Sequence, residues 1–136
     1  MKNIIFLFLL AAFTFTACNE KATGGSDYPE FNAGETFELG LGKTMQLKGK
    51  KLTVEFTEVK QDSRCPEGVN CVRAGEVVFV LKAGAQSHTL TQENKKPVSV
   101  TADGYKYTVD AVMPYPKSTV KKDPKAYVLQ MSVTKM

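Results

Sequence analysis

Short runs in which apolar and polar residues alternate recur through residues 35–136, and this pattern restricts the fold more than any other feature. In the clearest run, residues 52–57, every second residue is apolar. Successive side chains of a β-strand point to opposite faces of the sheet, so this pattern predicts a half-buried strand. After the N-terminal segment, no window of 11 or more residues has helical periodicity. The chain is therefore expected to be all-β.

Turn signals between the runs predict about seven or eight strands in one domain. Residues 76–82 include five consecutive apolar positions, which indicates a strand covered on both faces. Asp103-Gly104 separates two alternating runs and predicts a hairpin, because both turn positions need a positive φ. We expect a single antiparallel β-sandwich, or a partly open barrel. Its other strands are expected at 37–41, 45–47, 86–91, 98–101, 105–113 and 127–134.

The first 17 residues have the form of an export signal. Lys2 precedes an apolar stretch at 4–13, which is too short to span a bilayer as a helix. Ala17 then stands directly before Cys18, and the segment resembles the looser lipoprotein signal of Bacteroidetes-type bacteria. This resemblance implies that residues 1–17 are removed and that Cys18 is lipidated. Ordinary secretion, with Cys18 present by chance, is the alternative.

Residues 18–34 are expected to be the lipidated cysteine and a flexible linker, because the stretch is polar and contains Gly-Gly-Ser. Residues 35–136 then form the sandwich domain. A lipid on Cys18 would anchor the protein in the cell envelope. Asn19 resembles the residue that sorts lipoproteins to the outer membrane in some bacteria, so the outer membrane is favoured over the inner.

The three cysteines fit an exported protein with one disulfide. If Cys18 carries lipid, Cys65 and Cys71 remain as an even pair, and an oxidising compartment allows them to bond. Closing so short a loop stabilises a chain by about 2 kcal/mol on the chain-entropy model. The disulfide is therefore expected to shape a loop more than to hold the whole domain.

Residues 62–75 are the most distinctive stretch, because they contain this cysteine pair and the only two arginines. The first interpretation is structural, a tied connection between two strands in which the planar Arg64 side chain pairs with Asp62, Glu67 or loop carbonyls. Loops also carry function more often than cores do, and Arg64 and Arg73 are the best-placed ligand contacts. The candidate binding loop consists of Asp62, Arg64, Glu67, Asn70 and Arg73.

The same stretch resembles a family of small uncharacterised exported bacterial proteins. The family pattern is D-S-R-C-P, four residues, C-V-W-A-G and a valine-rich strand, and a later tyrosine-bearing strand ends in P-Y-P. Residues 62–66, 71–75 and 105–116 match it, except that Arg73 replaces the tryptophan. The resemblance covers about residues 51–134. It implies an architecture and no activity.

Catalytic and metal-binding chemistry have few candidate residues. The chain has one histidine, His88, with no carboxylate in its local segment, and it has no tryptophan to bind a sugar. Cys65 and Cys71 lack neighbouring histidines for zinc, so no metal and no cofactor are predicted. A calcium site at Asp62, Glu67 and Asn70 is a weaker possibility, since these residues lack dense acidic spacing. An enzyme is disfavoured.

The charge pattern also excludes a nucleic-acid partner. The formal net charge is +4, and the basic residues are interspersed with acidic ones. The sequence therefore favours a monomeric, lipid-anchored envelope protein that binds or assembles with an unknown protein or glycan. The alternative is an inhibitor or sequestering protein that uses the tied loop against an envelope hydrolase, because a disulfide lowers the ordering cost of binding.

Overall fold

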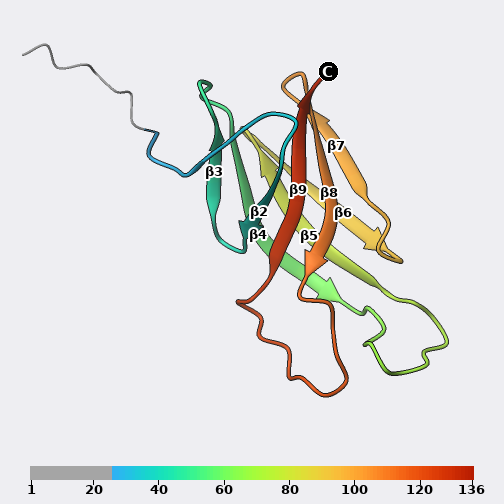
Figure 1. Ribbon diagram of the computed structural model, residues 1–136. Coiled ribbons are helices and arrows are strands. Elements are labelled where there is room, and N and C mark those ends of the chain that lie inside the picture. Colours follow the sequence, from blue (N-terminus) through green and yellow to red (C-terminus); the bar gives the residue numbers. More distant parts are fainter. Residues whose placement is uncertain (1–25) are drawn as a thin grey trace, which may run out of the picture.

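Two β-sheets packed face to face make up the fold in the computed structural model, which describes residues 26–136 (Figure 1). The expected signal peptide, Cys18 and the first part of the linker lie outside the described residues. All elements in the described part are strands. They are β1 (Glu30–Phe31), β2 (Thr36–Gly40), β3 (Thr44–Leu47), β4 (Thr53–Asp62), β5 (Glu76–Ala83), β6 (Gln86–Glu93), β7 (Val98–Ala102), β8 (Tyr105–Met113) and β9 (Val128–Lys135).

The strands divide into a five-stranded sheet, in the order β1-β3-β4-β5-β6, and a four-stranded sheet, in the order β2-β9-β8-β7. All neighbouring pairs are antiparallel except β1 and β3, which run parallel. The sheets do not close on each other. The expected all-β sandwich is confirmed, and the two sheets are not closed into a barrel. The expected hairpin at Asp103-Gly104 is also present, with φ values of 52° and 77°.

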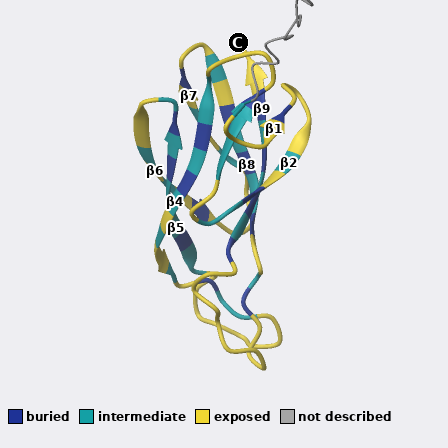
Figure 2. Ribbon diagram, turned by 90° about the vertical axis from the view of Figure 1, so that its left-hand side faces the viewer, coloured by how far each residue is buried: buried dark blue, intermediate teal, exposed yellow. Residues whose placement is uncertain are grey.

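The core lies between the sheets and is built from every second residue of the long strands. On β5 and β9, buried residues alternate with half-buried or exposed ones (Figure 2). Phe56 of β4 and Phe79 of β5 are fully buried, and their rings meet edge to face with centroids 6.0 Å apart. Burying such side chains stabilises the fold by about 1.5–3 kcal/mol each.

The apolar run in β5 is covered on one face only, so the prediction of two covered faces was wrong. Val77, Phe79 and Leu81 are buried, whereas Val78 and Val80 are half-buried on the outer face. β5 lies between β4 and β6, where neighbouring side chains on both strands shield the outer valines without a third layer.

The ordered structure includes part of the expected linker. β1 lies inside residues 18–34 and pairs with β3. Phe31 is only 4% exposed, and its ring stacks on Phe37 at a centroid distance of 4.3 Å. The backbone N–H of Gly34 also donates to the carbonyl of Val133 over 2.8 Å. These contacts attach the chain before residue 35 to the sandwich.

The sandwich has two different ends (Figures 1 and 2). One end, called the loop end below, carries residues 63–75, 94–97 and 114–127 between strands. The opposite end carries tight turns at 48–52, 84–85 and 103–104. The described chain begins near this opposite end, because the Ser26 hydroxyl lies 3.0 Å from the Gln46 side chain, which itself donates to the carbonyl of Lys50.

Candidate functional site

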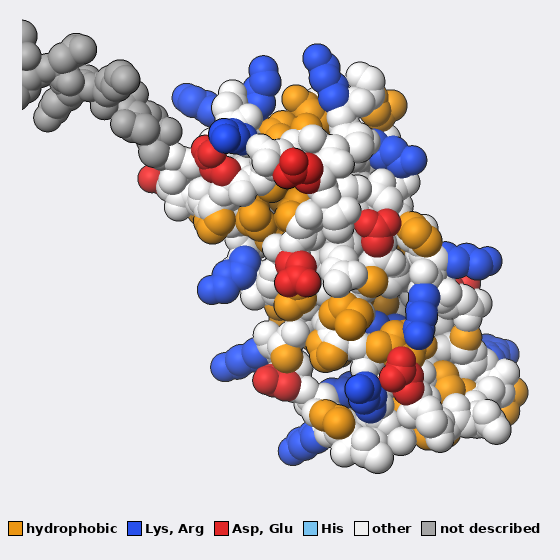
Figure 3. Space-filling view, viewed as in Figure 1, with side chains coloured by type: hydrophobic (Ala, Val, Ile, Leu, Met, Phe, Trp, Pro, Cys, Tyr) orange, Lys and Arg blue, Asp and Glu red, His pale blue; other side chains and the backbone are white. Residues whose placement is uncertain are grey.

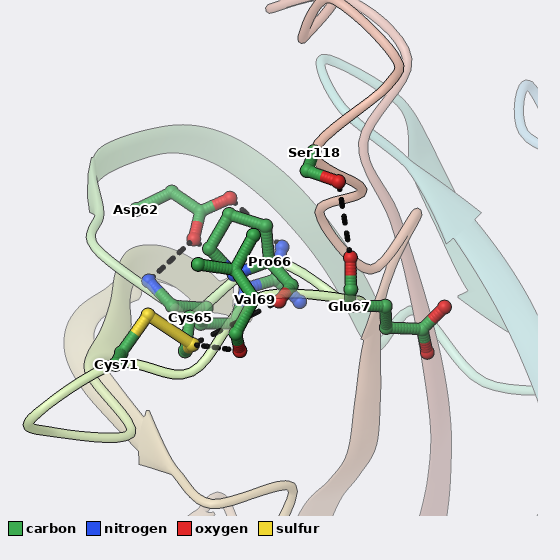
Figure 4. The surroundings of a disulfide bond; sticks show 8 residues. Asp62, Cys65, Pro66, Glu67, Val69, Cys71 and Ser118 are labelled. Atoms are coloured by element: carbon green, nitrogen blue, oxygen red, sulfur yellow. Dashed lines mark hydrogen bonds and ion pairs between the residues drawn. A yellow bond between two sulfur atoms is a disulfide. The ribbon is translucent and has the colours of Figure 1, made fainter.

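Two long loops lie side by side at the loop end, and residues of both contact each other. The loop 63–75 joins β4 to β5, and the loop 114–127 joins β8 to β9. Glu67 and Lys117 form an isolated parallel bridge. The backbone N–H of Glu67 donates to the Pro116 carbonyl over 2.9 Å, and the Ser118 hydroxyl donates to the Glu67 carbonyl over 3.4 Å (Figure 4).

Arg64 is the central residue of this contact. Its side chain is 5% exposed and pairs with Asp62, the last residue of β4, through bonds of 2.8 Å from Nε to Oδ1 and 2.9 Å from Nη2 to Oδ2. The same guanidinium donates to the carbonyls of Val112 and Pro114. Its carbon also lies 5.1 Å from the centre of the Tyr115 ring. Bidentate pairs of this kind fix geometry as well as charge.

Two further side chains complete the group that we call the Asp62 cluster, which consists of Asp62, Arg64, Lys122 and Tyr127. The Tyr127 hydroxyl donates to Asp62 Oδ2 over 2.8 Å, and the Lys122 ammonium donates to the Asp62 carbonyl over 2.8 Å. Because Lys122 and Tyr127 belong to the loop 114–127, this aspartate binds the second loop directly.

Burial and hydrogen bonding act in opposite directions on the Asp62 carboxyl group. Burial disfavours its charged form, but the hydrogen bonds from Arg64 and Tyr127 and the charge of Arg64 outweigh burial and hold the pKa of Asp62 below its usual value. Burial, together with the bond to the Asp62 carboxylate, raises the pKa of Tyr127 to about 12. The aspartate is therefore ionised and the tyrosine neutral across the physiological range.

The expected disulfide between Cys65 and Cys71 is present, with the two Cα atoms 5.9 Å apart (Figure 4). Between the disulfide and the strands β4 and β5, the two arms of the loop remain paired. The backbone N–H of Ser63 donates to Glu76 and that of Cys65 donates to Ala74, both over 2.8 Å. Gly75 permits this close pairing, since its φ is +70° and a Cβ atom there would lie 1.9 Å from the Ser63 carbonyl oxygen.

The structure divides the five predicted binding-loop residues into two groups. Asp62 and Arg64 lie together in the cluster, which realises one of the pairings expected for Arg64. Glu67, Asn70 and Arg73 are exposed. Glu67 lies 3.8 Å from the ammonium of Lys95, whereas Asn70 and Arg73 form no side-chain hydrogen bond or ion pair with residues 26–136. Only the second group has its side chains exposed to a ligand.

Apolar side chains are exposed at the tips of both loops. Val72 is fully exposed, Val120 is 61% exposed and Val69 is 46% exposed. Figure 3 shows basic side chains beside hydrophobic ones at this end of the molecule. A contiguous exposed apolar patch with a polar rim marks an interaction site, and these three valines are the exposed apolar side chains that the two loops offer to one.

Several residues of the site were not predicted from the sequence. Lys122 was not singled out and Tyr127 was assigned only to a strand, yet both bind Asp62. Tyr115 was noted only within a strand-ending Pro-Tyr-Pro segment, yet Arg64 and Lys95 both contact its ring. The one signal in the sequence was a tyrosine held between two prolines, which limit the conformation of the chain around it.

The only histidine of the chain and its acidic side chains were the candidates for catalysis and metal binding. His88 lies half-buried on β6, opposite Leu81 of β5 and away from the loop end. Within residues 26–136, no group of three or more histidine, cysteine, aspartate or glutamate side chains is placed to hold a metal ion. The same part of the chain contains no helix able to cross a membrane.

No protein-family model matches this chain, and neither a curated protein nor a solved structure shows significant similarity to it.

Proposed function

We propose that the protein is a non-enzymatic binding module of the cell envelope, held in the membrane by lipid on Cys18. In this proposal the loop end is the surface that meets a protein or glycan partner. The observation that supports it most strongly is the fully exposed Val72 side chain on a loop whose base is fixed by buried polar contacts. An apolar group in this position has no packing role within the sandwich.

Rigidity at the base of the loops favours binding through their tips. The loop 63–75 is held by the Asp62–Arg64 pair and by the disulfide. It is also held by two hydrogen bonds between the loops, in which Glu67 donates to Pro116 and Ser118 donates to Glu67. A surface that is already ordered loses less conformational entropy when a partner binds. The exposed valines can therefore contribute apolar burial without a large ordering cost.

The direction of the chain supports the same surface. Ser26 lies near the end of the sandwich opposite the loops, and only eight positions separate it from Cys18. This stretch spans at most about 29 Å when fully extended. A lipid on Cys18 would then hold the sandwich close to the membrane with its loop end facing outwards, and the outer membrane is the proposed site.

A second function, inhibition of an envelope hydrolase, is favoured by one specific observation. Val72 and Arg73 follow directly after Cys71, beside the ring that the disulfide closes, and both side chains are exposed. Exposed side chains held beside a short, covalently closed loop are suited to enter a cleft in an enzyme. In that case the purified protein would lower hydrolase activity in envelope extracts, and Val72→Asp would relieve the inhibition.

Crosslinking and capture from the native envelope test the main proposal. We expect Val72→Asp to reduce capture of the partner, because it places a charge on the apolar tip. Met136→Asp is the matched control, since Met136 is also an exposed apolar residue (75%) and its backbone bonds to Gly104 at the opposite end. Capture that responds to Met136→Asp and not to Val72→Asp would refute the assignment of the surface.

The anchor has a separate test. Mass spectrometry of the mature N-terminus is expected to find Cys18 as the first residue, carrying acyl groups, and membrane fractionation is expected to place the protein with the outer membrane. An unmodified Cys18 would remove the anchor from the proposal.

A further inference from the structure

A cleft of about 320 Å³ lies at the loop end, between the loop 114–127 and the Asp62 cluster. Its apolar walls consist of Pro114, Tyr115, Pro116, Val120, Ala126 and Tyr127. Ligand-binding pockets in proteins have volumes of roughly 300–1,000 Å³, with mostly apolar walls and a few polar groups. This cleft has walls of that kind, and its volume lies near the lower limit of the range.

The cleft has fixed walls. Tyr127 is 8% exposed and is held by its hydrogen bond to Asp62. Pro116 is buried, and its carbonyl accepts the 2.9 Å bond from Glu67. Because Tyr127 is attached to the end of β4 and Pro116 to the loop 63–75, contacts within the protein hold both residues in place.

The rim of the cleft has more positive than negative charge available to a ligand. Lys117 and Lys121 are exposed and form no ion pair with any residue of the described sandwich. Lys122 is already bound to the Asp62 carbonyl, and the Asp62 carboxylate is paired with Arg64. Asp123 is the other acidic residue that lines the cleft, and its carboxylate accepts a 2.9 Å hydrogen bond from the backbone N–H of Lys125. Two free ammonium groups therefore stand beside an apolar cavity.

We propose that this cleft binds an acidic peptide segment of the protein partner. One apolar side chain of that segment enters the cleft, and carboxylates on the flanking residues pair with Lys117 and Lys121. This inference rests on the proposed function, because it supplies the chemistry of the partner that the loop end meets. Charge complementarity at the rim would favour acidic partners and reject basic ones.

The local chemistry favours a peptide over a glycan or a phosphate group. A sugar is commonly held on the open face of an aromatic ring, but the Tyr115 ring is already contacted by Arg64 at 5.1 Å and by the Lys95 ammonium at 4.1 Å. A phosphate group is best matched by the planar fork of an arginine. Arg64 is buried in its pair with Asp62, and Arg73 lines a different cleft with Ser63 and Glu93.

Fluorescence anisotropy with defined peptides tests the inference. The probes are four labelled, end-blocked tripeptides in which phenylalanine, tyrosine, leucine or valine stands between two glutamates, and the protein is the full chain in a neutral detergent. At least one probe is expected to bind, and the same sequence with lysines in place of the glutamates is expected not to bind.

Charge reversal at the rim supplies the site-specific evidence. Lys117→Glu/Lys121→Glu is expected to weaken binding by about tenfold or more at low salt, and Val120→Asp to weaken it through the apolar wall. Lys106→Glu/Lys135→Glu is the matched control, because these are two exposed lysines of β8 and β9 outside the cleft. Circular dichroism of each variant checks that the fold is retained.

Four results would overturn the inference. They are no binding by any acidic probe, equal binding of the lysine-flanked probes, equal weakening by Lys106→Glu/Lys135→Glu, and displacement of a bound probe by the soluble lipid dihexanoyl-phosphatidylglycerol. If the probes fail while Val72→Asp still abolishes capture of the native partner, the cleft is not the peptide site and the binding function stands. If Val72→Asp also has no effect, both proposals fail.

Discussion

Arg64 joins the two sheets of the sandwich through its pair with Asp62. The guanidinium holds the Asp62 carboxylate, at the end of β4 in the five-stranded sheet, by bonds of 2.8 and 2.9 Å. It also donates to the carbonyl of Val112, which belongs to β8 in the four-stranded sheet. One buried ion pair thus connects both layers and both long loops at the end that we propose to bind a partner.

Replacing Arg64 should destabilise the fold strongly. Arg64→Met would leave the buried Asp62 carboxylate with only the Tyr127 hydroxyl and the Lys122 ammonium, which lies 3.7 Å away, and would remove the donor to the Val112 and Pro114 carbonyls. The cost should be about 3 kcal/mol in unfolding free energy. Arg73→Met is the matched control, because the other arginine is exposed, and its effect should stay within about 0.5 kcal/mol. Chemical denaturation of both variants checks this, and equal effects would contradict it.

Acid should remove the contribution of Asp62 to stability. The pKa of this carboxyl group is lowered in the folded state, so its stabilising effect is complete above the unfolded value of about 3.9 and is lost as the pH falls through the lower folded value. The difference in unfolding free energy between the wild type and Asp62→Asn should therefore shrink from pH 5 to pH 2. A difference that is constant over this range would show that the charge of Asp62 has no role.

Gly75 should tolerate no side chain. Gly75→Ala has to adopt a φ of +70° and also places Cβ against the Ser63 carbonyl. Gly42→Ala is the control, because Gly42 has a φ of +73° and open space around it. Gly42→Ala should lose about 1 kcal/mol and Gly75→Ala about 2 kcal/mol more, as measured by thermal or chemical unfolding. Similar losses would mean that the paired arms of the loop can separate freely.

Removing the disulfide should loosen the loop tip and leave its base in place. Cys65→Ser/Cys71→Ser is expected to lower the unfolding free energy by about 2 kcal/mol. In hydrogen exchange, the amides of Glu67 and Val69, which are hydrogen-bonded in the intact loop, should lose protection, while the Ser63 amide keeps it through its bond to Glu76. Loss of protection at Ser63 would show that the disulfide, rather than the Asp62 cluster, positions the base of the loop.

Period-two patterns predicted most of the fold because each strand buries one face. The eight strands from β2 to β9 occur where alternation and turn residues indicated them. β1 was missed because two residues cannot show a period. The second half of β4 was missed because register shifts between Phe56 and Glu58 and between Val59 and Gln61 interrupt the alternation.

The site was less predictable, since its contacts join residues far apart in the chain. The loop 63–75 stood out by its cysteines and arginines, and its Asp62–Arg64 pair is local. Tyr127, in contrast, lies 65 positions from Asp62, and the Val112 carbonyl lies 48 positions from Arg64. Such contacts follow from how the sheets pack, and no local pattern of residue types encodes them.

Site-specific photocrosslinking in the native envelope tests the central claim most directly. A photoreactive residue is placed at Val72 on the loop end and, in a second variant, at the exposed Lys51 in the turn at the opposite end. The account predicts one specific crosslinked partner from position 72 and none from position 51. Crosslinks to that partner from position 51, with none from position 72, would contradict the assignment of the loop end as the binding surface.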